Sequence, residues 1–98
     1  MLRHDAAMIS DNASRHQYEL LQDGHVAAHI VYRMHGTGTI ELVHTEVEPA
    51  YEGKGLASQV AKFALDDARS RGLKVIPTCS YVAGWIKKHP GYEDLIAR

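Results

Sequence analysis

Two glycines flank a lysine just before a predicted helix, in the segment Gly53-Lys54-Gly55. Glycine lets the backbone curl so that several N–H groups converge on one point. The helix dipole adds partial positive charge there, and Lys54 can add a full charge. Such a loop is typical of phosphate and pyrophosphate sites. The other interpretation is an ordinary turn that needs glycine for its backbone, and the loop alone does not decide between the two.

Two other phosphate-binding motifs are excluded by the residues around this loop. A Walker loop needs Ser or Thr after its lysine, and Lys54 is followed by Gly55. A dinucleotide fingerprint needs a third small residue, for which Ser58 is a poor fit, and an acidic residue after the next strand. This chain has Pro77 and Thr78 at that point. The loop therefore fits neither ATP nor NAD.

The chain has one cysteine, Cys79, which follows a short predicted strand and is a candidate nucleophile. A thiolate with access to solvent can attack an electrophilic carbonyl. The alternative is a small buried apolar side chain, which is the commoner fate of an unpaired cysteine. A single cysteine also excludes an internal disulfide.

His44 and Glu46 are candidate proton acceptors. They are two residues apart in the predicted strand TIELVHTEV (residues 39–47), so they share one face while Thr45 points the other way. A His–Glu pair at the end of a strand can take up a proton directly or through water. The alternative is that Glu46 pairs with a nearby lysine and that His44 packs against its neighbours.

The first half of the chain has the pattern of antiparallel strands. Two apolar, β-branched runs, Gln17–Leu21 and Val26–Met34, are joined across Asp23-Gly24, which is a strong hairpin signal. A second turn leads into Thr39–Val47, and the three runs predict an antiparallel meander. Ile9 and its neighbours predict a short additional edge strand.

The second half predicts a helix, a strand and a shorter helix. Apolar residues recur at helical spacing from Leu56 to Ala68, and Gly72 is placed to end that helix. Leu73–Pro77 then predicts a short strand, which a right-handed crossover would pair in parallel with the meander. Ser80 is placed to cap a second helix through His89, and residues 92–97 predict one more turn. The fold class expected is α/β (α+β).

Composition excludes several classes of protein. The 98 residues carry a net charge of −1 without a basic run, which excludes the usual electrostatic pattern of a nucleic-acid binder. The histidines show no metal-ligand spacing. No apolar segment approaches the roughly 20 residues that cross a bilayer, and MLRHDAAMISDNAS has no apolar stretch of a signal peptide. We therefore expect one domain over residues 1–98, a cytoplasmic location, and neither a metal nor a membrane or nucleic-acid partner.

The segment HTEVEPAYEGKGLASQVAKFALDDARSRGLKVIPTCSYVAGWIKKHPGYEDL resembles the smallest branch of the GNAT (general-control-related N-acetyltransferase) superfamily. The resemblance runs from about Tyr18 to Leu95. GNAT proteins carry an acetyl-CoA loop of the form Q/R-x-x-G-x-G/A, and Gly53 and Gly55 match its glycines. Ala50 stands where Gln or Arg is usual, which removes a side-chain contact and leaves the backbone amides in place.

The resemblance implies a minimal GNAT fold, with a mixed sheet that splays apart between Val43–Val47 and Leu73–Pro77. The pantetheine arm of acetyl-CoA is expected in that gap, beside the backbone of Val47. Tyr81 is expected near the departing thiolate, and Cys79 either accepts the acetyl group or lines its pocket. The cofactor-binding residues expected in all are Thr45, Val47, Gly53, Lys54, Gly55, Leu56, Ala57, Ser80 and Tyr81.

The function implied is an acetyl-CoA-dependent N-acetyltransferase, with Cys79, Glu46 and His44 as the catalytic candidates and acetyl-CoA as co-substrate. The acceptor is an amine, either a small molecule or an exposed protein lysine, and the protein is expected to be a monomer or a weak dimer. The alternative is a non-catalytic module that binds CoA or acyl-CoA. A scaffold without a ligand is a third possibility.

Overall fold

A five-stranded mixed sheet forms the centre of the computed structural model, which describes residues 8–98. The first seven residues, part of the segment in which no signal peptide is expected, lie outside the described residues. The strand order follows the chain, from β1 to β5. The strands are β1 (Met8–Asn12), β2 (Gln17–Gln22), β3 (His25–His35), β4 (Thr39–Val47) and β5 (Lys74–Ile76).

The antiparallel meander predicted from the sequence is confirmed, and β1 is the short edge strand expected around Ile9. The hairpin between β2 and β3 turns at Asp23 and Gly24, whose φ angles are 52° and 81°. β5 pairs in parallel with β4, as predicted. It is shorter than the predicted strand Leu73–Pro77, because only Lys74–Ile76 hydrogen-bond in register with β4.

The long helix α1 (Leu56–Ser70) has the predicted apolar face, which buries Leu56, Val60, Ala61, Ala64, Leu65 and Ala68. The second helix, α2 (Ser80–Lys88), is followed by a 3-10 helix at Pro90–Leu95. The predicted cap at Ser80 is wrong, because Ser80 is the first helical residue. Cys79 occupies the cap position, and no side-chain hydrogen bond caps this helix.

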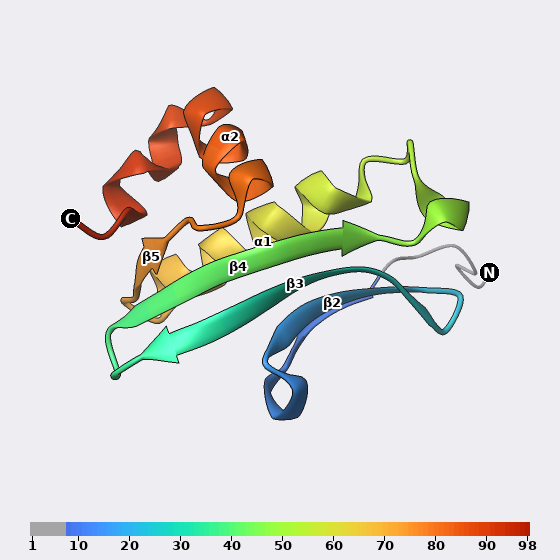
Figure 1. Cartoon of the computed structure of the whole chain (residues 1–98), viewed down its shortest axis with the longest axis horizontal. Coiled ribbons are helices and arrows are strands. Elements are labelled where there is room, and N and C mark those ends of the chain that lie inside the picture. The colour runs from blue at the N-terminus through green and yellow to red at the C-terminus, as the bar shows by residue number, and fades with distance from the viewer. Residues whose placement is uncertain (1–7) are drawn as a thin grey trace.

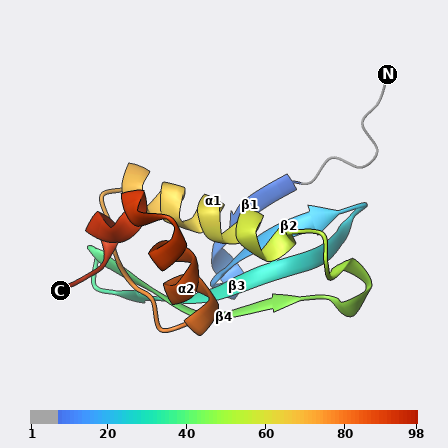
Figure 2. The same ribbon diagram turned by 90° about the horizontal axis from the view of Figure 1, so that it is seen from above.

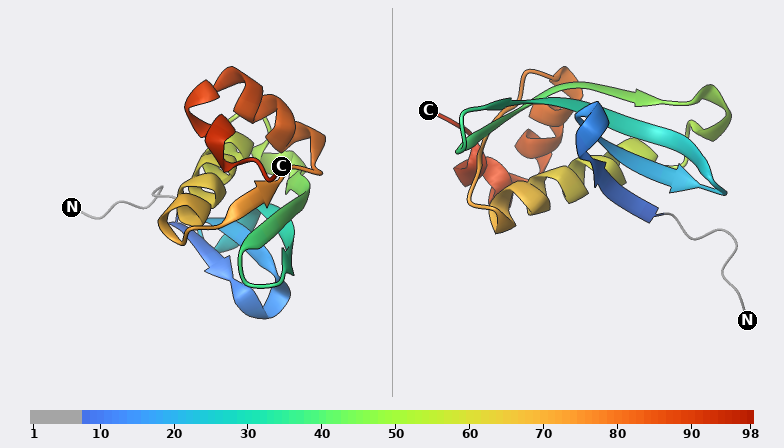
Figure 3. Two further views of the ribbon diagram at one scale, coloured as in Figure 1. Left: turned by 90° about the vertical axis from the view of Figure 1, so that its left-hand side faces the viewer. Right: turned by 90° about the horizontal axis from the view of Figure 1, so that it is seen from below.

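Both helices lie on the same side of the sheet (Figures 1 and 2). The end-on view shows two layers, with the strands on one side and α1 and α2 on the other (Figure 3, left). We call the sheet face toward the helices the inner face and the opposite one the outer face. Within residues 8–98, no helix covers the outer face. The inner face carries the buried strand residues Tyr18, Leu20, Ala28, Ile30, Tyr32, Ile40, Leu42 and Val75.

Two buried tyrosines of the inner face donate hydrogen bonds to carboxylates, Tyr18 to one on α1 and Tyr32 to one on β1. The Tyr18 hydroxyl donates to Asp67 Oδ2 at 2.6 Å, and Arg71 Nη1 contacts the same oxygen at 3.0 Å. The Tyr32 hydroxyl donates to Asp11 Oδ1 at 2.7 Å. Burial and this bond to Asp11 raise the pKa of Tyr32 to about 12, and burial and the bond to Asp67 raise the pKa of Tyr18. Both hydroxyls therefore stay protonated and keep donating at neutral pH.

Replacing Tyr18→Phe should lower the free energy of unfolding by about 1–2 kcal/mol, because it removes a hydrogen bond to a charged group inside the core. Chemical denaturation measures this loss. Tyr81→Phe is the matched control, since Tyr81 is exposed and its hydroxyl bonds to no residue that the structure describes. Equal stabilities of the two variants would contradict the role assigned to the Tyr18–Asp67 bond.

Candidate functional site

β4 and β5 separate soon after they pair. Their register covers only Thr39–Glu41 on β4 and Lys74–Ile76 on β5. One further main-chain bond follows, from the Cys79 N–H to the Leu42 carbonyl at 2.8 Å. Among the described strands, Val43–Val47 pairs only with β3. The splayed sheet that the family resemblance implies is therefore present.

A β-bulge marks the point of separation. The register with β3 passes from Leu42 opposite Tyr32 to His44 opposite Val31, so Val43 is an additional residue. A bulge increases the local twist and bends its strand, which turns the end of β4 away from β5. It also changes which side chains face inward.

The segment after β5 is held to β4 on the outer face by Glu41. Thr78 Oγ1 donates to Glu41 Oε2, and His35 Nε2 lies 2.8 Å from Glu41 Oε1. The hydrogen bonds from Thr78 and then from His35 lower the pKa of Glu41. The carboxylate thus stays ionised and fixes the start of the gap between the strands.

The glycine loop presents a row of main-chain donors. Glu52 N–H bonds to the Pro49 carbonyl, and the first bond into α1 runs from Gln59 N–H to the Gly55 carbonyl at 3.3 Å. Between them, the N–H groups of residues 53–58 donate to no carbonyl of the described residues. Gly53 and Gly55 have φ angles of 81° and 75°, a conformation that side chains disfavour. The loop combines free donors with the positive end of a 15-residue helix.

These donors border a cavity of about 320 Å³ between the end of β4, the loop and α2. Seven of the predicted cofactor-binding residues line it: Thr45, Val47, Gly53, Gly55, Leu56, Ala57 and Tyr81. Lys54 is exposed beside it. Ser80 lies instead in an adjoining cavity of about 230 Å³ with Gly84, Trp85 and Lys88, and Tyr81 lines both cavities.

Three residues of the first cavity were missed by the sequence analysis: Tyr51, Glu52 and Ser58. The Trp85 indole N–H donates to Ser58 Oγ at 2.8 Å and so ties α2 to the first turn of α1. Trp85 also stacks on His89, with ring centroids 3.7 Å apart. Trp85 is buried in the core. No local sequence pattern signals the contact between Trp85 and Ser58, which are 27 residues apart.

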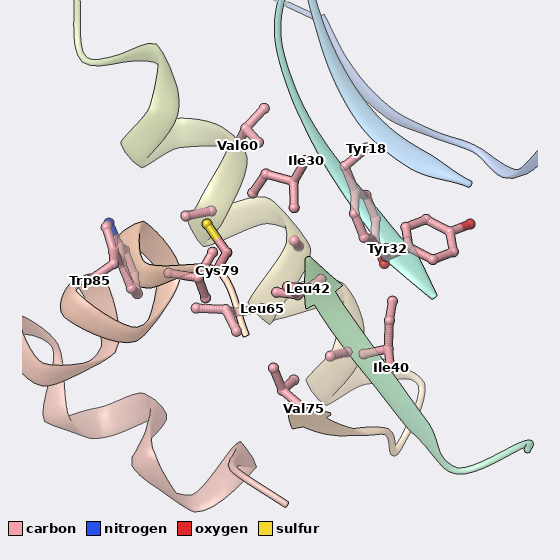
Figure 4. Close-up of a cluster of buried hydrophobic side chains, with 14 of the residues drawn as sticks. Tyr18, Ile30, Tyr32, Ile40, Leu42, Val60, Leu65, Val75, Cys79 and Trp85 are labelled. Atoms are coloured by element: carbon pink, nitrogen blue, oxygen red, sulfur yellow. The ribbon is translucent and has the colours of Figure 1, made fainter. Parts of the chain in front are cut away.

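Cys79 lies in the core and is 8 % exposed (Figure 4). Its Sγ is 3.1 Å from Oγ1 of Thr45, and Thr45 lines the first cavity. The thiol is thus one side chain away from that cavity and does not line it. Burial of the thiol matches the apolar alternative, and a role as nucleophile stays a prediction.

His44 and Glu46 lie on the outer face, opposite the face of Thr45. His44 Nε2 is 3.4 Å from Glu46 Oε2, and His29 Nε2 is 3.9 Å from Glu46 Oε1. The predicted His–Glu pair is therefore present. The alternative is wrong in both parts, because the partners of Glu46 are histidines and the His44 side chain is 57 % exposed. The role of the pair as a base stays a prediction.

Residues 8–98 lack the features of two other classes of site, a metal centre and a membrane-spanning helix. No group of three or more His, Cys, Asp or Glu side chains there could hold a metal ion. None of the helices in this part of the chain combines the length and the apolar character that a membrane span requires.

Residues 17–95 match the family model of GCN5-related N-acetyl-transferases, which covers most of the chain. The chain belongs to this family. Its curated relatives include Protein NATD1 of Mus musculus, 35% identical over 83 residues, with 84% of this chain and 76% of the mouse protein covered. Protein NATD1 of Danio rerio is 34% identical over 91 residues, with 90% and 83% covered.

Solved structures support the same fold. A GCN5-like protein of Staphylococcus aureus, determined by NMR, superposes with a TM-score of 0.70 at 22% identity and covers 98% of this chain and 91% of its own. The ribosomal-protein-S18-alanine N-acetyltransferase of Escherichia coli gives a TM-score of 0.60 at 20% identity, with 76% of this chain and 50% of its own covered. The expected minimal GNAT fold is confirmed.

The Cys79 thiol should react with a disulfide reagent such as DTNB at least about tenfold more slowly in the folded protein than in denaturant, because it is buried. The matched control carries Ser80→Cys with Cys79→Ala, which moves the thiol to the neighbouring exposed position. This variant should react at similar rates folded and unfolded. Fast reaction of native Cys79 would contradict the burial described here.

Proposed function

We propose that this protein is an acetyl-CoA-dependent N-acetyltransferase that acts on an amine. The observation that carries the proposal is the row of N–H groups at residues 53–58, which donate to no carbonyl within residues 8–98 and lie beside a cavity and the open edge of β4. Anionic phosphates suit the donors and the helix dipole. An amide-rich arm suits a strand edge with free main-chain groups. Membership of the GCN5-related family supports the same assignment.

The residues present fit a CoA-type ligand. The amides of residues 53–58 would hold its pyrophosphate, and Thr45, Val47 and Tyr81 would border its arm. Lys54 and, beyond Tyr81, Lys88 supply positive charge for phosphate groups. Glu52 also lines the cavity and opposes an anion there, so the amides and lysines must outweigh it. When bound, acetyl-CoA supplies an activated acetyl thioester.

The chain's own side chains supply the proton chemistry. An amine that reaches the gap from the outer face meets Glu46 and His44, which can accept its proton. Tyr81, on the side of the cavity, can donate a proton to the departing thiolate. Direct attack by the amine needs no protein nucleophile. A route through Cys79 requires the thiol to leave its buried position.

Replacing Gly53→Asp should weaken CoA binding more than tenfold, which is about 1.4 kcal/mol, because it places a carboxylate among the phosphate-binding donors. Gly53→Asn is the matched control, since it imposes a similar backbone strain at φ 81° without the charge. Isothermal titration of CoA measures both. Equal losses in the two variants would mean that charge at residue 53 does not matter and that the phosphates bind elsewhere.

Acetyl transfer is tested by release of free CoA thiol with acetyl-CoA and a panel of amines. Glu46→Gln should lower kcat by about a hundredfold near neutral pH, as expected for the loss of a general base. Glu93→Gln, another exposed carboxylate, is the control and should leave kcat unchanged.

The same assay separates the two routes and the alternative function. Cys79→Ala should retain activity if the amine attacks directly, and loss of activity with intact CoA binding would instead support covalent transfer. CoA binding without thiol release from any amine would leave the non-catalytic binding module as the function.

A further inference from the structure

The outer face carries a second cavity, of about 560 Å³, that neither the acetyl-CoA assignment nor the family explains. It lies over β2 and β3, on the face opposite Thr45 and Cys79. Its lining is mostly polar and comes from segments far apart in the chain: Asn12, Arg15, Gln17, Glu19, Val26, His29 and Glu48.

Glu19 is the only charged residue among those described that is buried, with 7 % of its surface exposed. Asn12 Nδ2 and Gln17 Nε2 both donate to its Oε2, at 3.0 and 2.6 Å. Its Oε1 accepts no hydrogen bond from residues 8–98. No buried side-chain oxygen or nitrogen of the described residues lacks a hydrogen-bond partner, so the unbonded Oε1 is accessible from the cavity. One oxygen of Glu19 is thus fixed by two amides, while the other is available to a ligand in the cavity.

Glu19 begins a row of ionisable side chains that crosses the outer face to the edge of the gap. Glu19 on β2 is directly opposite His29 on β3, and His29 is directly opposite Glu46 on β4. Neighbouring strands are about 4.8 Å apart, so the backbones of Glu19 and Glu46 are separated by about 10 Å. The row has a carboxylate at each end, and its Glu46 end is the predicted base of acetyl transfer.

The charges around this row favour a cation. Glu48 is a second carboxylate in the cavity. Glu46 lies just outside it, with Oε1 3.9 Å from Nε2 of the lining residue His29. Arg15 is the one lysine or arginine among the lining residues, and it is exposed and forms no ion pair with any described residue. The two carboxylates of the cavity and the adjoining Glu46 thus outnumber the one guanidinium, which gives the row a negative potential.

We propose that the outer-face cavity binds the distal ammonium of a small linear polyamine, whose other end is the acceptor amine. Glu19 and Glu48 hold the distal ammonium, and the chain of the ligand crosses His29 to Glu46. The reacting end of this assignment rests on the proposed function, and the anchoring end does not. In the reaction, a bond forms between the amine nitrogen and the acetyl carbonyl carbon, and the carbon–sulfur bond of acetyl-CoA breaks. Glu46 takes the proton of the amine, and CoA leaves as the thiolate, which is then protonated.

The test is isothermal titration of the full-length protein with spermidine and with butylamine, without acetyl-CoA. Spermidine should bind at least about tenfold more tightly than butylamine, because only spermidine reaches both ends of the row. Glu19→Gln should remove about tenfold of the spermidine affinity. This substitution keeps the size of the side chain and one oxygen that can accept the hydrogen bonds from Asn12 and Gln17. Arg15→Gln should strengthen spermidine binding several-fold, since it removes the opposing charge.

The two carboxamide variants change the affinity in opposite directions, which an unspecific effect on the fold would not produce. Wild-type affinity for CoA shows that each variant is folded. Equal affinities for spermidine and butylamine, or an unchanged affinity in Glu19→Gln, would overturn the proposal. Spermidine binding through Glu19 without CoA release in the presence of acetyl-CoA would support the anchor and overturn acetyl transfer.

Discussion

The hydrogen bond from the Cys79 N–H to the Leu42 carbonyl is the last main-chain link between β4 and the segment that follows β5, within the part of the chain described. Up to that bond the sheet is continuous, and beyond it the end of β4 has one free edge. On the outer face, the hydrogen bond from Thr78 to Glu41 joins the same two segments. Helix α2 begins at Ser80, immediately after Cys79. The width and position of the gap therefore depend on a few bonds at one place.

The position of the gap between β4 and β5 determines where acetyl-CoA and the acceptor amine, the two proposed ligands, can meet. The glycine loop and the first cavity lie on the inner side of β4, next to the start of α1. The His44–Glu46 pair and the second cavity lie on the outer side. At the end of the sheet that borders the glycine loop, the free edge of β4 is where the two sides meet. A thioester from one side and an amine from the other would thus come into contact only at the gap.

Much of the fold follows from local sequence. The apolar periodicity of α1, the Asp23-Gly24 hairpin and the glycine loop each carry their own signal, and the structure has all three. The pairing of His44 with Glu46 also follows from the two-residue period of a strand. The face of the sheet on which His44 and Glu46 lie does not follow from that period. Simple alternation places His44 and Glu46 with Leu42 on the inner face, and the extra residue at Val43 moves them to the outer one.

Other parts of the site depend on contacts between distant segments. The outer cavity needs Asn12, Gln17 and Glu48 around Glu19, and the Trp85–Ser58 bond joins two helices. A pattern in a single stretch of sequence does not reveal such neighbours. The predicted cap at Ser80 was wrong for a related reason, since the bond from Cys79 to β4 fixes where α2 begins.

The central claim is that the amides of residues 53–58 and the free edge of β4 bind CoA together. Backbone amide NMR during a titration with CoA tests it most directly, because it reports on each N–H separately. The largest shift changes should fall on residues 53–58 and 43–47, with small changes on β1 and β2. Changes that avoid the loop, or that concentrate on the outer cavity around Glu19, would contradict the account.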